Sequence, residues 1–466
     1  MLWACLLLPQ LALDGVLRHR TDDTPLVLVD GPINARTIVA VNARARAAGL
    51  YIGQRLTAAQ ALQARFDAIP YDADEVERWQ QFLAGVAYRY SSQVALLPHA
   101  IVLEVSKSQS LFGSWSVMER RLRSDITALG FRHRVTAAPT PHGAYVLAGV
   151  GDGQTALSQE GMQRLLDDVP LSKSRLPTQA MDTLPSMGVR RLGQLLRMPR
   201  DGLQRRFGFT LLQAMDRLMG DAPAGLDLYI PSDGIDWYVE LSHEVENIAA
   251  LIFPLRRMTG DLAAYLSGRD GGVQRFLLRL EHRDRVVTDV PVGMLSPERS
   301  ADVLFDAARG RLEQVQLPAP VLALRLIAED LPSFVPAGRD LFDERPANAL
   351  PFEQLRERLR ARLGDSAVHQ WGTTIDPRPE HSQHAAAEDE GPLEPRPRPT
   401  WLLERPIPWR GALHIVSGPE RLETGWWDGG DTRRDYYIVE TDMGQRAWAF
   451  CAPGEQSGWM LHGWFA

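Results

Sequence analysis

The chain opens with an unbroken apolar run, Leu2–Leu8, which ends at Pro9. Such a run is typical of a strand buried on both faces of a sheet, and it is too short to cross a bilayer. Strand and helix patterns then alternate, with strands predicted at 25–30, 37–41, 94–105 and 133–138 and helices at 56–64, 74–93 and 115–129. We therefore expect one compact α/β domain over residues 1–154.

The pattern changes after this domain. Residues 155–232 predict short helices, and residues 233–335 predict an α+β module with a strand hairpin at 273–292. Residues 336–400 hold an amphipathic helix, Phe352–Leu363, and then a proline-rich, charged stretch that predicts a disordered linker over 373–400. Residues 401–466 carry seven of the twelve tryptophans and predict a small β-rich domain, in which these rings form either the core or a binding face. The predicted fold class is α+β multidomain.

Composition excludes several classes of function. The net charge of -7 gives no general basic surface, so any contact with nucleic acid must be local. Two cysteines, Cys5 and Cys451, are too few for a disulfide framework or a zinc site and fit a reducing cytoplasm. The chain has no phosphate-loop or nucleophile-elbow pattern. We expect no metal, no cofactor and no membrane partner.

A basic segment follows a tight turn in the helical region. Gly188 precedes Arg190 and Arg191 in a pattern like a helix-hairpin-helix, in which main-chain amides and a helix N-terminus face a phosphate. Residues 184–211 hold six arginines, including Arg205 and Arg206, against one acid, a local net of +5. This pattern predicts non-specific DNA contact; the alternative is an ordinary solvated helical face.

Two further segments suggest binding. Arg275 and Arg279 share a face of the predicted hairpin, as do 283 and 285 if its strands are regular, and such a ribbon fits a nucleic-acid groove. Residues 241–330 hold 11 arginines and 13 acids, however, so a mixed surface is the alternative. In the segment 338–342, two adjacent apolar side chains in a polar tether favour either a partner's pocket or a staple onto the preceding module.

The order of these regions resembles that of the Y-family translesion DNA polymerases over residues 1 to about 335. Within that family the chain resembles the ImuB-type proteins of bacterial damage-induced mutagenesis operons. The segments that carry the resemblance are Ser110–Gly113, Ala138–Pro141, Arg206–Gln213, Phe253–Arg257, Leu317–Val321, Gly425–Gly429 and Arg434–Tyr437. The resemblance implies a palm-and-fingers domain, a helical thumb, a little-finger module and a C-terminal partner-binding domain.

Most catalytic positions of the active family members are lost in this chain. The acid of the first strand falls at or near Leu7, and the later Asp-Glu pair falls at or near His99 and Ala100. The nucleotide-binding Tyr is replaced by Ala43, and the triphosphate-binding Lys by about Tyr145. The residues left are the nucleotide-binding Arg, as Arg46, and one supporting acid, Glu104. Residues 1–13 and 94–103 contain no acid at all, so a small shift of the alignment restores no cluster.

The resemblance therefore implies a non-catalytic adaptor in the DNA-damage (SOS) response, associated with the nucleoid. Its implied partners are damaged or primer-template DNA, the sliding clamp, a recombinase-like protein and an error-prone replicative-type polymerase. Asp340, Leu341 and Phe342 match the end of a clamp-binding peptide whose usual leading Gln is Gly338 here. Two alternatives stay open: a weakly active Y-family polymerase that uses Glu104 and main-chain oxygens, and a DNA-binding repressor or decoy that blocks primer ends.

Overall fold

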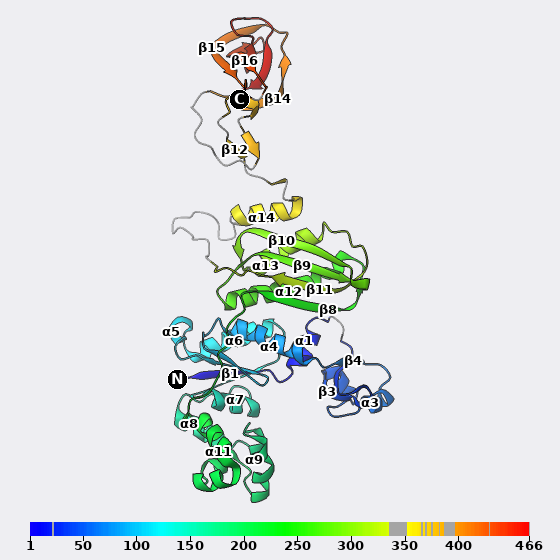
Figure 1. The fold of residues 1–466 in the computed structure, drawn as a ribbon, viewed down its shortest axis with the longest axis vertical. Coiled ribbons are helices and arrows are strands. Elements are labelled where there is room, and N and C mark those ends of the chain that lie inside the picture. Colours follow the sequence, from blue (N-terminus) through cyan, green and yellow to red (C-terminus); the bar gives the residue numbers. More distant parts are fainter. Residues whose placement is uncertain are drawn as a thin grey trace. The chain divides into compact units, whose positions relative to one another are not determined.

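The computed structural model describes residues 1–20, 23–334, 352–364, 367–368, 371–373, 376–381, 383–385, 397–427 and 429–465. Contacts within the chain divide it into two compact units, Met1–Arg362 and Leu363–Ala466 (Figure 1). The predicted α+β multidomain fold class is confirmed. No helix among the described residues combines the length and apolarity that a bilayer span requires.

The first unit is built around an antiparallel sheet of four strands in the order β5-β6-β1-β7, which we call the central sheet. The strands are β5 (Val94–Leu97), β6 (Ala100–Glu104), β1 (Trp3–Leu7) and β7 (Arg134–Ala138). The apolar run at the N-terminus is an inner strand, and both of its faces are buried, as predicted.

Helices cover both faces of the central sheet. The side chains of Ala4 and Leu6 pack with α4 (Ala73–Ala87) and α6 (Trp115–Ala128), whereas those of Cys5 and Leu7 pack towards α7 (Pro141–Val150). The predicted helices at 74–93 and 115–129 are therefore present, although each is shorter than its pattern. The following α1 (Leu11–Leu17) carries Asp14, which therefore lies beyond the strand.

A small three-stranded sheet in the order β3-β2-β4 lies beside this layer and has its own core. It comprises β2 (Leu26–Asp30), β3 (Thr37–Val41), β4 (Asp67–Pro70), α2 (Ala43–Ala47) and α3 (Leu56–Leu62). Asn42 caps α2 by accepting from the Ala45 amide at 2.7 Å, and it also accepts from the Leu26 amide at 3.1 Å. The cap thus fixes the helix to the neighbouring strand.

Short helices follow α7, as predicted: α8 (Gln159–Asp167), α9 (Thr178–Thr183), α10 (Leu192–Leu196) and α11 (Arg200–Met219). Their apolar residues join Cys5 and Leu7 in one cluster, so this helical region shares a core with the central sheet. The segment α11 is not one straight helix, because Gly208 has φ 77 and ψ -175 within it. Glycine tolerates this conformation, and the chain kinks there.

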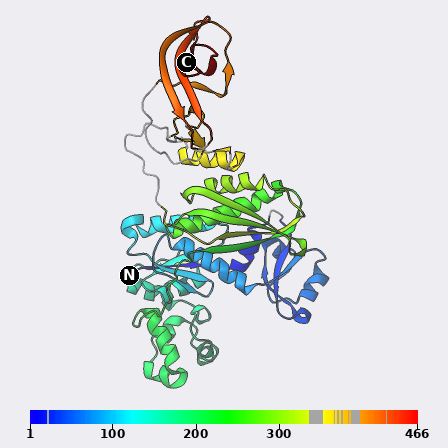
Figure 2. The same cartoon turned by 45° about the horizontal axis from the view of Figure 1, so that its top comes forward.

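The third part of the first unit is a sheet of four antiparallel strands in the order β10-β9-β11-β8. It comprises β8 (Ile235–Val245), α12 (Ile248–Gly268), β9 (Val273–His282), β10 (Val287–Glu298), α13 (Ala301–Leu312) and β11 (Val321–Ala328). The predicted hairpin and the predicted strand at 321–327 are both present. Figure 2 shows α12 and α13 together on one side of this sheet.

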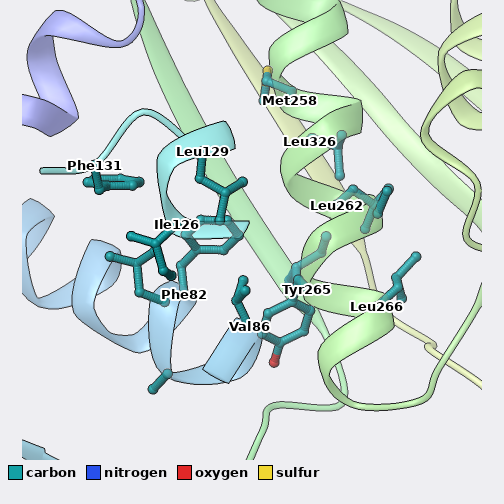
Figure 3. Packing of buried hydrophobic residues seen from close by; sticks show 14 of the residues in the cluster. Phe82, Val86, Ile126, Leu129, Phe131, Met258, Leu262, Tyr265, Leu266 and Leu326 are labelled. Atoms are coloured by element: carbon teal, nitrogen blue, oxygen red, sulfur yellow. The ribbon is translucent and has the colours of Figure 1, made fainter. Parts of the chain in front are cut away.

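This third part and the central sheet share one continuous apolar core. Figure 3 shows Phe82 and Val86 of α4 facing Leu262 and Tyr265 of α12. The two helices approach so closely that a Cβ added at Gly268 would lie 1.9 Å from the carbonyl oxygen of Gly85. Only glycine permits that approach.

A buried ion pair joins the same two parts. Arg18, at the C-terminus of α1, donates to Asp261 of α12, and their side chains are 0% and 6% exposed. The guanidinium carbon lies 4.7 Å from the ring centroids of both Trp79 and Phe131. The charge is therefore held by one carboxylate and two aromatic faces instead of by water.

The second unit contains a five-stranded antiparallel sheet in the order β14-β18-β17-β16-β15 and a two-stranded sheet. The strands are β12 (Trp371–Thr373), β13 (Gln383–Ala385), β14 (Trp401–Pro408), β15 (Leu413–Thr424), β16 (Thr432–Thr441), β17 (Arg446–Cys451) and β18 (Met460–Trp464).

The helix α14 (Phe352–Leu363), which up to Arg362 belongs to the first unit, has the predicted bounds.

The prediction of a disordered linker over 373–400 is wrong for residues 376–381, 383–385 and 397–400, which the structure describes. Its described parts make specific contacts with the five-stranded sheet: Glu380 pairs with Arg434 at 3.1 Å, and Arg398 pairs with Glu420 at 2.6 Å. Proline and charge predict a chain that forms no core of its own. They do not exclude an extended chain that packs on a core formed by other residues.

Replacement of Asp261 by Ala should leave Arg18 buried without a counter-charge. We expect a loss of about 3–5 kcal/mol in the free energy of unfolding of the full chain, measured by urea denaturation. Asp233→Ala is the matched control, because Asp233 is 95% exposed and pairs with Arg269 on the surface. That change should cost less than about 1 kcal/mol, and equal losses for the two variants would contradict the buried-pair interpretation.

Candidate functional site

The sheet register brings together the positions at which the family pattern places carboxylates. Leu7 lies opposite Ala100, and the Leu8 amide donates to the His99 carbonyl at 2.8 Å. Leu7 and Ala100 are 4% and 0% exposed, whereas His99 is exposed and has φ 55. Divalent cations that bind triphosphates need clustered carboxylate oxygens, and the side chains of Leu7, His99 and Ala100 supply none.

Main-chain oxygens beside this pair are already used. Each of the four carbonyls of residues 97–100 accepts a hydrogen bond from another part of the chain. In order, the donors are Gln80 Nε2 (2.7 Å), Tyr145 Oη (2.8 Å), the Leu8 amide (2.8 Å) and Gln80 Nε2 again (2.9 Å). A cation that took these oxygens as ligands would compete with contacts that hold the turn in place.

A positive charge lies next to the turn. The hydroxyl of Tyr145 accepts from Arg175 Nη1 at 2.7 Å, and the guanidinium carbon lies 4.3 Å from the tyrosine ring centroid. Burial raises the pKa of Tyr145, although Arg175 opposes the shift. Burial also raises the pKa of the Cys5 thiol, on the same sheet face as Leu7, so the thiol is neutral at physiological pH. A fixed guanidinium repels a bound metal cation, and no acid among the described residues forms an ion pair with Arg175.

The residual acids serve the fold. Glu104 is 1% exposed and lies opposite Trp3, four residues along β6 from Ala100, or roughly 13 Å at the rise of a strand. It accepts from the Ser106 amide at 3.0 Å and from the Ser106 hydroxyl, and so closes the turn after β6.

Asp14 is similarly engaged, since it accepts from the Arg132 amide at 2.8 Å and from Arg132 Nε at 2.6 Å. Burial raises the pKa of Asp14, and Arg132 opposes that shift. Within the described ranges, no three His, Cys, Asp or Glu side chains gather as a metal site. The residues at this site therefore do not fit the pair of divalent metal ions that the resemblance to polymerases implies.

Arg46 lies on α2, beside the small sheet. Its side chain is exposed, and no ion pair is found for it in the described part of the chain. Its main-chain amide bonds to the Asn42 carbonyl at 3.0 Å. The residue is therefore free to contact an anion from solvent, but the structure brings no other predicted nucleotide-binding residue into contact with it.

The structure places Gly188, Arg190 and Arg191 in the turn before α10. Gly188 has φ 82, as a tight turn requires. The amides of Arg190 and Arg191 both donate to Gln194 Oε1, at 2.8 and 3.1 Å, which was not foreseen from the sequence. A phosphate that bound these amides would displace this side chain. The Arg191 guanidinium pairs with Asp168, whereas Arg190 is exposed and has no ion pair among the described residues.

Arg205 and Arg206 lie just before the kink at Gly208, on the exposed surface of α11. Neither has an ion pair among the residues that the structure describes. Phe209, directly after the kink, is 67% exposed. Two other arginines of the same basic segment are paired with acids from outside it, Arg197 with Asp167 at 2.5 Å and Arg200 with Asp216 at 2.6 Å. The exposed charge is therefore smaller than the sequence count indicates.

Arg275 and Arg279 do point to the same side of β9, because its buried residues alternate with them. Arg279 makes a bidentate pair with Asp289 of β10, at 2.7 and 2.9 Å, which leaves Arg275 as the free charge of the two. The prediction that residues 283 and 285 share one face of the hairpin is wrong, because it required regular strands. These residues form a 3-10 turn, in which Arg285 has φ 61 and Arg283 pairs with Glu244.

The clamp-peptide prediction, Asp340, Leu341 and Phe342, lies outside the described residues. The sequence reasoning missed Gln80 and Arg175, which hold the turn at 97–100 from α4 and from the loop before α9. No local signal marks either residue, because each acts across a long sequence separation. Arg175 has φ 58, which is unusual for a residue with a side chain and is visible only in the structure.

Residues 14–148 match the model of the IMS family, described as impB/mucB/samB. Protein ImuB of Caulobacter vibrioides, in each of two strains, is 28% identical over 465 residues, which is 90% of this chain and 100% of that protein. DinB from Sulfolobus solfataricus is 14% identical with a TM-score of 0.40, over 72% of this chain and 100% of that one. A post-insertion binary complex of Dbh DNA polymerase is 13% identical with a TM-score of 0.40, over 71% of this chain and 99% of that one.

Tyr145→Phe should remove the hydroxyl that links the Pro98 carbonyl to Arg175. Because both groups then lose a partner in a partly buried place, we expect a loss of about 1–2 kcal/mol in unfolding free energy. Urea denaturation followed by circular dichroism measures it. Tyr51→Phe is the control, since Tyr51 is 61% exposed. A Tyr145 variant as stable as the control would mean that the hydroxyl does not hold the turn.

Proposed function

We propose that this chain is a non-catalytic DNA-binding adaptor of damage-induced translesion synthesis. The observation that carries the proposal is the composition of the β1–β6 pair. Where polymerases of this kind need carboxylates, Leu7 lies opposite Ala100 and the adjoining carbonyls are bonded to Gln80, Tyr145 and Leu8. Two-metal phosphoryl transfer needs negative oxygens at this place.

The comparisons support the biological setting. The IMS match over residues 14–148 and the 28% identity to ImuB over 90% of the chain favour a role related to translesion synthesis. Because the match includes 90% of this chain, the helical region, the third part and the C-terminal unit are each at least partly within it. The fold itself is that of an enzyme family, so loss of catalysis rests on the site residues alone.

The free arginines support DNA contact. Arg190, Arg205 and Arg206 are exposed on the helical region without ion pairs in its described residues, and Arg275 is exposed on β9. Guanidinium groups without a protein partner can neutralise phosphates in a bidentate way. Main-chain amides at residues 190 and 191 join them only if the Gln194 side chain moves aside.

The remaining partners follow from the resemblance. Asp340, Leu341 and Phe342 match a clamp-binding peptide, and the C-terminal unit is the region for a recombinase-like protein and an error-prone polymerase. When one of several weak binding sites on a chain is occupied, the other sites meet their partners at a raised effective concentration. An adaptor needs this property, because it must bring a second polymerase to a primer end without chemistry of its own.

The decisive experiment uses one purified sample of the full chain for two measurements. Primer extension with magnesium or manganese should give no added nucleotide, and a pull-down should recover the sliding clamp. Leu341→Ala with Phe342→Ala should abolish the pull-down by removing the apolar anchors. Nucleotide addition that Glu104→Gln abolishes would instead establish a weak polymerase. DNA binding without clamp recovery would identify a DNA-binding decoy.

Arg205→Ala with Arg206→Ala should lower the salt dependence of duplex binding. Each phosphate contact contributes about 0.9 to the slope of log affinity against log salt, so the double variant should lose up to about 1.8. Fluorescence anisotropy at several salt concentrations measures the slope. The matched control is Arg197→Ala with Arg200→Ala, whose guanidinium groups already pair with Asp167 and Asp216. Equal changes in both double variants would show that ion pairing does not select the DNA-contacting arginines.

A further inference from the structure

The five-stranded sheet of the C-terminal unit has two different faces. One face packs a small apolar core that includes Tyr437, Val439, Ala449 and Leu461. The other face carries Tyr436, Trp448 and His462, which we call the aromatic face. Side chains of a strand alternate between faces, so neighbours such as Tyr436 and Tyr437 serve opposite sides. The apolar core on the first face does not account for the aromatic side chains on the second face.

The aromatic face is a stacked array. The rings of Tyr436 and Trp448 lie 4.0 Å apart at 19°, and those of Trp448 and His462 lie 5.9 Å apart at 11°. Tyr436 Oη and His462 Nδ1 share a hydrogen bond of 2.7 Å. Tyr436 and Trp448 are each only 2% exposed. Residues that precede the sheet in the sequence cover these rings.

A groove of about 320 Å³ stays open at the edge of this face, beside the segment that covers the rings. Its floor is formed by Tyr436, Ile438 and Trp448, and its wall by residues 417–421 of β15. The register of β15 against β16 shifts twice in this stretch, between Ile415 and Ser417 and between Ser417 and Glu420. Such irregularities re-aim side chains, and here they bring the Glu420 carboxylate to the groove.

Residues 397–399, Pro-Arg-Pro, lie along the groove. Pro397 lines it, and Arg398 places its guanidinium carbon 5.0 Å from the centroid of the Trp448 ring. The same guanidinium makes a bidentate pair with Glu420, at 2.6 and 2.8 Å. A Cβ added at Gly463 would meet the Pro399 ring at 2.7 Å, so the second proline fits against a glycine.

These contacts are those by which proteins bind proline-rich peptides. Proline fixes its own φ and keeps the preceding residue extended, so the sequence Pro-Arg-Pro is held in an extended form before it binds. Aromatic grooves accept the proline rings, and a planar guanidinium suits both an aromatic face and a carboxylate. The Arg398 and Glu420 side chains are 45% and 28% exposed. The contact is therefore modest in strength and open to exchange.

We propose that the aromatic face is a binding site for extended peptides in which proline and arginine alternate, and that residues 397–399 fill it in the free chain. A partner carrying such a peptide gains the site by displacing the chain's own segment. The sequence itself repeats the pair, as Pro395-Arg396 before Pro397-Arg398. This inference goes beyond the adaptor function, and it would stand even if the chain were shown to polymerise.

The test uses the full chain and a fluorescein-labelled hexapeptide with the sequence of residues 395–400, Pro-Arg-Pro-Arg-Pro-Thr. The variant Pro397→Gly, Arg398→Ala, Pro399→Gly, which we call the emptied variant, removes the side chains with which the segment covers the aromatic face. Anisotropy should show saturable binding to this variant. Binding to the unchanged chain should be weaker by a factor of roughly ten or more, because the tethered segment competes at an effective concentration near the millimolar range. Equal affinity for both proteins, or no binding to the variant, would overturn the proposal.

Two further variants separate the groove from an unspecific effect. Glu420→Ala in the emptied variant should abolish binding, because the guanidinium loses its carboxylate. Glu420→Arg should restore binding to a peptide in which the second arginine is replaced by glutamate. Near-ultraviolet circular dichroism checks that the tryptophans stay packed. Should the triple variant not fold, Arg398→Ala alone keeps both prolines and should still raise peptide affinity. Failure of the charge exchange, or preference for an oligothymidylate over the peptide, would contradict a peptide site.

Discussion

The structure of the first unit depends on the double burial of strand β1. Its alternate side chains enter two different cores, one shared with α4, α6 and the third part, the other shared with α7 and the helical region. A carboxylate on such a strand is costly unless cations or donors surround it. Leu7 and Cys5 remove that cost and let the helical region pack on the sheet. The apolar side chains of β1 therefore consolidate both cores.

The charges around Leu7 and Ala100 also disfavour a bound metal ion. Next to Leu7 and Ala100 the structure has a neutral Cys5 thiol, a buried Tyr145 and the guanidinium of Arg175. Each of these groups is unfavourable for a bound divalent cation. The arginines of the helical region show a related effect. The sequence window 184–211 has a net charge of +5, yet Asp167, Asp168 and Asp216, all outside it, neutralise three of its arginines.

Sequence reasoning succeeded where periodicity and burial act together, as in β1, the hairpin strand β9 and helix α14. It failed where local backbone angles, the placement of one side chain or a residue distant in sequence decides the geometry. The turn at 283–285, the kink at Gly208 and the bonding of Gln194 to two amides depend on local angles or side-chain placement that periodicity does not encode. At the candidate site, the absence of acids was readable from residues 1–13 and 94–103, whereas the roles of Gln80 and Arg175 were not. The linker prediction treated 373–400 by composition alone and missed the surface that Glu380 and Arg398 contact.

The close approach of Gly85 to Gly268 bears on how this protein can be divided for study. The sequence pattern predicts a boundary at residue 232, between the helical region and the α+β module that follows. The backbones of α4 and α12 meet without side chains between them, however, and a cut at that boundary would strip the apolar face of α4. A fragment ending there would expose Phe82 and Val86 to water and invite aggregation. The smallest part worth expressing alone from this end of the chain therefore includes α12 and the sheet behind it.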